Sequence, residues 1–315
     1  MFFIAYMHHE IAVRIRDFNV RLEKILKWGE TALKLQNNMQ PRRQVSSGLQ
    51  MKTSQLVEPN LVGKEILHAC RSLVNLVLEH KDKKAYKLGI VGTGGIGKTT
   101  LAQKIYNDDQ VKKVFTKKAW ICVSQKYSQM YSEVDVLKEV LRNFGVHREQ
   151  GETKTELQKK LAETIENESF FLVLDDVWHP EVWLDVLRTP LDAAATGIVI
   201  VTTRHDSVAV SIGVDHMHRV ELMSTQVGWE LLWRSMNINE EREVKNLKDI
   251  GMEIVSKCGG LPLAIKLIGR VLTTKDKTEN EWRKLIKNSA WSRTDLQPEL
   301  RGALYVLYKR MVTNF

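Results

Sequence analysis

The hydrophobic pattern of the chain changes its period twice. Between residues 86 and 222, short apolar runs alternate with stretches of helical spacing. Such runs predict buried strands, and strands that alternate with helices predict a parallel sheet covered on both faces. The predicted strands are residues 86–91, 119–124, 170–175, 197–203 and 218–222, and the predicted helices between them are residues 99–107, 134–144, 155–165 and 207–213.

The chain before this region shows helical spacing only. Residues 10–36 predict one helix, because apolar side chains recur every three or four residues at Ile11, Ile15, Phe18, Leu22 and Ile25. The stripe covers about two heptads, so it indicates either part of a coiled coil or one helix of a bundle. Residues 37–59 are rich in polar residues, with Pro41, Gly48 and Pro59, and predict a linker.

Helical spacing also precedes the first strand and follows the last one. Residues 65–79 predict a helix with one apolar face, formed by Ile66, Cys70, Leu73 and Val77. Past residue 222 the strands stop, and three helices are predicted: residues 226–236, residues 244–257, and a third that Pro262 opens. The first of these carries Trp229, Leu232, Trp233 and Met236 on one face. We therefore expect a compact, all-helical unit after the sheet.

Composition and charge narrow the class of protein. Hydrophobic residues make up 43% and charged residues 27% of the 315 residues, which is typical of about two globular domains. The net charge of +9 favours an anionic partner. Because the basic clusters are short and lack interleaved aromatic residues, most of them are expected on solvated faces, and no clear nucleic-acid site is predicted. The clusters are Arg42–Arg43, Lys81 with Lys83–Lys84, Lys112–Lys113 and Lys117–Lys118.

The cysteines and the apolar segments indicate the cellular compartment of the protein. Cys70, Cys122 and Cys258 are odd in number and widely spaced, which predicts neither a disulfide framework nor a metal site. Each lies beside apolar residues, so buried free thiols in a reducing compartment are expected. No segment is long and apolar enough to predict a membrane span. We therefore expect a cytoplasmic protein, or one that also enters the nucleus.

A glycine-rich segment follows the first predicted strand. GTGGIGKTT (92–100) fits the pattern G-x-x-x-x-G-K-[ST] between a predicted strand and a predicted helix. Glycines let the backbone approach a ligand, and the N–H groups of a helix N-terminus converge on an anion. This predicts a phosphate-binding loop in which Lys98 contacts the β- and γ-phosphates and Thr99 helps to hold Mg²⁺. The expected nucleotide contacts are Gly92, Thr93, Gly94, Gly95, Ile96, Gly97, Lys98, Thr99 and Thr100.

Polar residues follow two further predicted strands. FFLVLDDVW ends its apolar run in Asp175 and Asp176, at the edge of an α/β sheet where ligands bind. Asp175 is expected to hold Mg²⁺ through water, and Asp176 to orient or deprotonate the water that hydrolyses the nucleotide. GIVIVTTR ends in Arg204, which from this rim can reach a γ-phosphate. The candidate catalytic residues are therefore Lys98, Asp176 and Arg204.

Five segments together resemble one family. GTGGIGKTTLAQKIYND, KKAWICVSQ, FFLVLDDVW, GIVIVTTR and CGGLPLAIKLIG occur in the order and spacing of the NB-ARC module of plant nucleotide-binding, leucine-rich-repeat immune receptors. The resemblance implies a P-loop NTPase of the ASCE and STAND type over residues 60–222, with strand order 5-1-4-3-2, and a helical ARC1 subdomain over residues 223–290. Residues 1–36 resemble the last helix of the family's N-terminal coiled coil, and residues 291–315 resemble the start of the winged-helix ARC2 subdomain.

The resemblance also implies further contacts and a mode of action. LVGKE (61–65) is similar to the segment that contacts adenine, which implies nucleotide contacts for Val62 and Gly63. GLPL (260–263) is similar to the motif whose proline, here Pro262, packs against the nucleotide. Arg204 corresponds to the sensor arginine. The family acts as a switch in defence, with an ADP-bound off state and an ATP-bound on state, and other receptor chains or signalling proteins bind its N-terminal helix.

Departures from the family pattern leave alternatives open. The Met-His-Asp motif and the leucine-rich repeats of the family do not occur in this sequence. A shortened form with slow or no ATP hydrolysis, at most a weak ATPase, is therefore expected. The alternative is a non-cycling adaptor or decoy that acts through residues 11–25. A metabolic kinase or nucleic-acid motor is less well supported, since no substrate site and no continuous basic groove is predicted.

Overall fold

The computed structural model describes residues 62–123, 132–146 and 151–287. The chain divides into two units, residues 1–50 and 51–315. The predicted helix over residues 10–36, the linker over 37–59 and the segment 291–315 lie outside the described residues, so they stay predictions, as do partners that would bind the N-terminal helix.

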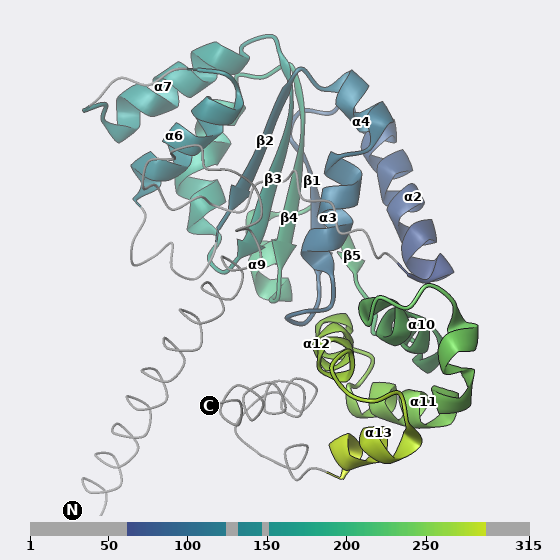
Figure 1. Cartoon of the computed structure of the whole chain (residues 1–315). Helices are drawn as coiled ribbons and strands as arrows, with labels where there is room; N and C mark the ends of the chain where they lie inside the picture. The colour runs from purple at the N-terminus through teal and green to yellow at the C-terminus, as the bar shows by residue number, and fades with distance from the viewer. Residues whose placement is uncertain (1–61, 124–131, 147–150, 288–315) are drawn as a thin grey trace, which may run out of the picture. The chain divides into compact units, whose positions relative to one another are not determined.

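Five parallel strands form the central sheet, in the order β2-β3-β4-β1-β5 (Figure 1). The predicted order 5-1-4-3-2 is therefore confirmed. The strands are β1 (Tyr86–Val91), β2 (Lys117–Cys122), β3 (Ser169–Val177), β4 (Thr196–Thr203) and β5 (His216–Arg219). Because all five strands run parallel, their carboxyl ends meet at one edge of the sheet.

Strand β5 differs from its predicted bounds of 218–222. It begins two residues earlier and ends at Arg219, pairing only with β1 at the edge of the sheet. The N–H of Val220 still donates to the carbonyl of Val91, at 2.9 Å, and the chain then leaves the sheet. An edge strand needs no continuous apolar run, since only one side of it is paired. The polar residues His216 and His218 therefore belong to the strand, although the apolar pattern did not include His216.

Alternate side chains of the central strands face two layers of helices. Phe171 and Val173 of β3 belong to the core that also holds α2 and α3, whereas Phe170 and Leu172 belong to the core under α6 and α7. Figure 1 shows these two layers on opposite sides of the sheet. The helices are α2 (Lys64–Glu79), α3 (Lys98–Tyr106), α4 (Asp109–Val114), α6 (Glu133–Asn143), α7 (Lys154–Ile165), the π-helical turn η1 (Val182–Leu187), α8 (Arg188–Leu191) and α9 (Asp206–Ile212). The predicted α/β architecture is confirmed.

The region after the sheet is helical, as predicted. It contains α10 (Thr225–Ser235), the 3-10 helix η2 (Glu241–Leu247), α11 (Lys248–Lys257), α12 (Pro262–Leu272) and α13 (Glu279–Ile286). The helix predicted over residues 244–257 is wrong at its start, because the backbone of the buried Val244 is non-helical, with φ −131°. The predicted apolar face of α10 is confirmed, since Trp229, Leu232, Trp233 and Met236 are all buried.

The cysteine prediction is partly wrong. All three cysteines lie in the described residues and form no disulfide, but only Cys258 is buried; Cys70 and Cys122 are half-buried. Cys70 lies on the flank of α2, and Cys122 ends the edge strand β2, so neither is enclosed on all sides. Burial raises the pKa of the Cys258 thiol to about 12.

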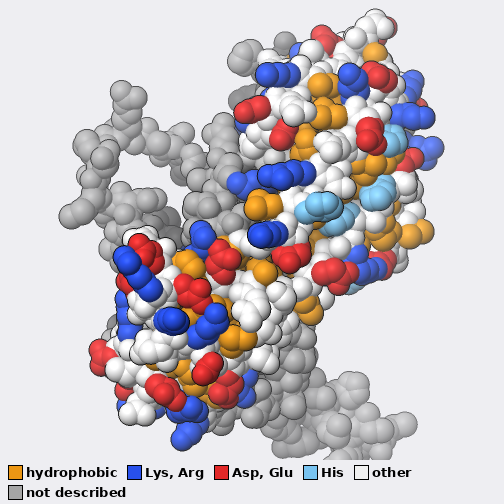
Figure 2. Space-filling model, turned by 90° about the vertical axis from the view of Figure 1, so that its right-hand side faces the viewer, with side chains coloured by type: hydrophobic (Ala, Val, Ile, Leu, Met, Phe, Trp, Pro, Cys, Tyr) orange, Lys and Arg blue, Asp and Glu red, His pale blue; other side chains and the backbone are white. Residues whose placement is uncertain are grey.

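Charge is mixed on the face of the molecule that Figure 2 shows. Basic and acidic side chains are interspersed there, and histidines gather in one area between apolar side chains. Of the predicted solvated clusters, Lys81 with Lys83–Lys84 and Lys112–Lys113 are exposed, Lys117–Lys118 is half-buried, and Arg42–Arg43 lies outside the described residues. Among the described helices, none is both long and apolar enough to cross a membrane.

Candidate functional site

The glycine-rich loop connects β1 to α3 at the carboxyl edge of the sheet. Gly92, Gly95 and Gly97 have φ values of 150°, 80° and 109°, in the region that favours glycine. Gly97 precedes α3 in a left-handed conformation and without a side-chain cap. No N-cap side chain therefore accepts a hydrogen bond from the first N–H groups of α3, and such uncapped N–H groups attract an anion.

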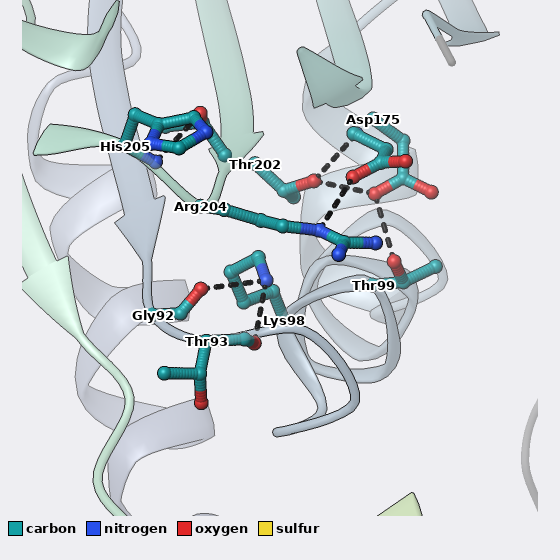
Figure 3. Close-up of polar contacts among 10 residues, drawn as sticks. Gly92, Thr93, Lys98, Thr99, Asp175, Thr202, Arg204 and His205 are labelled. Carbon is teal, nitrogen blue, oxygen red and sulfur yellow. Dashed lines mark hydrogen bonds and ion pairs between the residues drawn. The ribbon is translucent and has the colours of Figure 1, made fainter. Parts of the chain in front are cut away.

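Lys98 extends back over this loop. Its side chain is buried, and its Nζ donates to the carbonyls of Gly92 and Thr93 at 2.8 and 2.9 Å (Figure 3). Burial lowers the pKa of Lys98, and the nearby Arg204 lowers it further, whereas Asp176 and Asp175 oppose this shift. The ammonium group is thus held at the mouth of the loop in a setting that favours a nearby negative charge.

Asp175 and Thr99, the two predicted Mg²⁺ ligands, are in direct contact. The Thr99 hydroxyl donates to Asp175 Oδ1 at 2.9 Å, and the hydroxyl of Thr202 donates to the same oxygen at 2.5 Å (Figure 3). Burial raises the pKa of Asp175, while the hydrogen bonds from Thr202 and Thr99 lower it. A hydroxyl and a carboxylate at this separation fit a hard divalent cation that takes its remaining ligands from water and phosphate.

Asp176 and Arg204 face each other at the carboxyl ends of the neighbouring strands β3 and β4. Asp176 has a φ of 56°, and a register shift between Leu174 and Val177 interrupts the pairing of β3 with β4 at this point. Arg204 Nε lies 3.6 Å from Asp176 Oδ1. A Cβ atom at Gly94 would lie 2.8 Å from Arg204 Nη1, so the guanidinium rests directly on the loop. The three candidate catalytic residues, Lys98, Asp176 and Arg204, are therefore brought together.

A cavity of about 390 Å³ adjoins the loop. Its mostly apolar wall includes residues that the sequence analysis assigned to the nucleotide: Val62, Gly63, Ile96, Gly97, Thr100 and Pro262. Residues 219–224, which lead from β5 to α10, form another part of the wall. A concave, largely apolar site beside a phosphate-binding loop suits a planar base.

Helix α12 contacts the loop directly. The N–H of Leu263 donates to the carbonyl of Gly95 at 3.2 Å, and a Cβ atom at Gly95 would lie 2.8 Å from Leu263 Cβ. The carbonyl at position 95 and the start of α12 therefore fix each other. Pro262 has no N–H of its own, which suits the first position of a helix.

A second hollow of about 420 Å³ lies between α2 and β5. His68, His216 and His218 line it together with Glu65 and Glu79. His218 borders both hollows, and burial lowers its pKa. Figure 2 shows histidine side chains gathered on this face.

Sequence reasoning missed three residues of this site. Thr202, Leu263 and Trp178 were given no role, although they lie within two residues of the predicted Arg204, Pro262 and Asp176, respectively. Their contacts depend on strand register and on the docking of α12. A polar residue at the end of a buried strand, such as Thr202, is the one signal that could have been read from the sequence.

Solved structures with a similar fold are available. An Aeropyrum pernix ORC1 protein in complex with DNA has a TM-score of 0.51, with 15% sequence identity, and the match covers 75% of this chain and 68% of that one. The Aeropyrum pernix ORC2 protein, described as ADPNP-ADP complexes, has a TM-score of 0.50 and 16% identity, covering 73% and 69%. At these identities the likeness shows the fold alone.

Sequence relatives are plant proteins. The chain is 34% identical over 237 residues to disease resistance RPP13-like protein 4 of Arabidopsis thaliana, covering 74% of this chain and 26% of that protein. It is 31% identical over 314 residues to putative disease resistance protein RGA4 of Solanum bulbocastanum, covering 98% of this chain and 31% of that protein. The chain thus spans less than a third of either relative. Because residues 68–242, more than half of its length, match the model described as the NB-ARC domain, the chain belongs to the NB-ARC family.

Proposed function

We propose that this chain is an ADP- and ATP-binding switch module that acts in the cytoplasm as part of a plant disease-resistance protein. The observation that carries the proposal is the convergence of Lys98, Arg204 and the Thr99–Asp175 pair at one loop. Two cations and an uncapped helix N-terminus suit a polyphosphate, and the adjoining cavity suits its base. The family membership and the disease-resistance relatives support the same assignment.

The roles of the individual side chains follow from their contacts. The Lys98 ammonium exchanges the carbonyls of Gly92 and Thr93 for phosphate oxygens, which are stronger acceptors because they are charged. Thr99 and Asp175 would hold Mg²⁺, which when bound neutralises charge on the β- and γ-phosphates. Asp176, half-buried and beside Arg204, orients a water for slow hydrolysis.

The contact between Leu263 and Gly95 supports a switch. A ligand can shift an equilibrium between two arrangements only by binding them with different affinity. Helix α12 contacts the same loop that receives the phosphates. The number of bound phosphates therefore affects how the helical region packs against this loop. The Leu263–Gly95 hydrogen bond is therefore the contact expected to differ between the diphosphate and triphosphate states.

The test is nucleotide binding by the purified chain. Mass spectrometry of the released ligand should find ADP or ATP, and Lys98→Ala should abolish binding of a fluorescent ADP analogue. Lys104→Ala is the matched control, because Lys104 lies in the last turn of the same helix α3, at the end away from the phosphate loop. Unchanged affinity in Lys98→Ala, or equal losses in both variants, would rule the proposal out.

A further inference from the structure

Trp178 and Arg204 directly follow two neighbouring strands at the carboxyl edge of the sheet. Trp178 follows β3 and Arg204 follows β4, and the last residues of these neighbouring strands, Val177 and Thr203, are register partners. Two residues that follow such a pair emerge at the same point of the carboxyl edge. The sequence thus places an indole beside a guanidinium although 25 residues separate them in the chain.

The two side chains form a cation–π contact. Arg204 Cζ lies 4.9 Å from the centre of the Trp178 ring, within the range in which such contacts stabilise. The imidazole of His205 meets the same indole edge-on, with ring centres 5.6 Å apart, and fixes its orientation. The buried Nε1 of Trp178 has no hydrogen-bond partner among the described residues. Trp178 therefore interacts with its neighbours through its ring and not through a hydrogen bond from its N–H.

Arg204 needs such a support. Its side chain is 40% exposed, and the one ion pair that it forms within the described part of the chain, with Asp176, is long at 3.6 Å. An ion pair of this length at a partly exposed position contributes little, and ordering a long arginine side chain costs conformational entropy. A ring, in contrast to a carboxylate, supports the guanidinium without neutralising its charge, so Arg204 stays available to an anion.

We propose that Trp178 is a positioning residue: its indole holds the Arg204 guanidinium over Gly94 and thereby sets how strongly the site prefers a nucleoside triphosphate over a diphosphate. The inference rests on the proposed function. It extends that function to Trp178, which acts on the nucleotide only through Arg204. It also explains why the apolar strand and acidic pair of FFLVLDDVW end in tryptophan.

The test is a double-mutant cycle read out by affinity. Dissociation constants for ADP and for a non-hydrolysable ATP analogue are measured with Mg²⁺ for the wild type, Trp178→Leu, Arg204→Gln and the double variant. Trp178→Leu should weaken triphosphate binding by about three- to thirty-fold, the range of one cation–π contact, and leave ADP binding unchanged. In the Arg204→Gln background the same change should have no further effect.

Two further variants keep the test decisive. Trp178→Tyr and Trp178→Phe retain a ring, so triphosphate affinity should fall in the order Trp, Tyr, Phe even if the leucine variant fails to fold. Equal losses for both nucleotides, or an undiminished effect of Trp178→Leu in the Arg204→Gln background, would overturn the inference while the proposed function stands. A wild type that binds neither nucleotide would instead refute the proposed function.

Discussion

The hydroxyl of Thr202 joins the two adjacent acidic residues of the site. Its Oγ1 donates to Asp175 Oδ1 at 2.5 Å and accepts from the N–H of Asp176 at 2.8 Å. One fully buried side chain thus orients the proposed Mg²⁺ ligand and fixes the backbone of Asp176, whose φ is 56°. The geometry of both carboxylates depends on a residue that would touch neither metal nor nucleotide.

Thr202→Val should therefore damage the site without changing its shape. The variant removes the hydrogen bond from Thr202 to the buried Asp175 oxygen and the hydrogen bond that the N–H of Asp176 donates to Thr202. Leaving these buried groups without this partner costs about 1–3 kcal/mol. We expect a lower melting temperature and weaker dependence of nucleotide binding on Mg²⁺. Thr202→Ser retains the hydroxyl and is the matched control. If both variants respond to Mg²⁺ like the wild type, the hydroxyl has no positioning role.

The pKa of Asp175 predicts a pH dependence with a definite sign. Because burial raises the folded pKa above the ordinary 3.8, the folded state binds this proton more tightly than the unfolded state. The stability that this proton contributes is fully present below pH 3.8 and is lost as the pH rises through the folded pKa. The free energy of unfolding of the wild type relative to Asp175→Asn, measured by urea titration, should fall over this interval. A difference that rises or stays flat would contradict the assigned shift.

The affinity for Mg²⁺ should change with pH in the opposite direction to this contribution to stability. Mg²⁺ requires the ionised carboxylate, so its apparent affinity in the presence of ADP should weaken as the pH falls through the raised pKa. Asp175→Asn should remove both the affinity and its pH dependence, which isothermal titration calorimetry can measure.

Gly95→Ala should disrupt the contact between the loop and α12. Its Cβ would lie 2.8 Å from Leu263 Cβ and 2.9 Å from Leu263 Cδ2, of which Leu263→Ala removes the second contact, and the φ of 80° is unfavourable for alanine by about 1–2 kcal/mol. Gly145→Ala controls for the unfavourable φ alone, since Gly145 has a φ of 84° and nothing within 4 Å of its Cβ position. We expect Gly95→Ala to lower the melting temperature more than Gly145→Ala, and Leu263→Ala to recover part of the loss. Equal losses would show that the contact is unimportant.

Lys118 should titrate near pH 8. It lies on β2, with Nζ 4.0 Å from the centre of the Tyr106 ring, and burial lowers its pKa to about 8. Because the folded state releases this proton first, stability relative to Lys118→Met should rise between pH 8 and pH 10.5. Chemical denaturation across this range measures the effect, and NMR of the labelled lysine measures the pKa directly. A pKa at or above 10.5 would contradict the buried setting.

Local patterns predicted the site where the chemistry is contiguous in the chain. The loop from Gly92 to Thr100 and the acidic pair after β3 needed only an apolar run followed by particular residues. The contact of Thr202 with Asp175 could not be predicted in this way, because it depends on the register of β3 with β4 across 27 residues. The contact of Trp178 with Arg204 has the same origin.

The fold was predicted best where periodicity was strong. Short elements were not predicted: α4 begins with an Asp108 cap and has only six residues, and η1 and α8 lie in a stretch that Pro190 interrupts. Too few turns are present in such elements for an apolar face to repeat. The bounds of β5 were wrong because an edge strand carries polar residues.

The segment 219–224 has two roles at once. It connects β5 to α10, and it forms part of the wall of the cavity next to the phosphate loop. Its two ends are tied to different regions, since Val220 bonds to Val91 of β1 and Met223 bonds to Gly260 before α12. Because one segment both connects the sheet to α10 and lines the cavity, ligand occupancy and the course of this segment are thermodynamically linked: a change in the segment that alters affinity is opposed to the same extent by the ligand that fills the cavity.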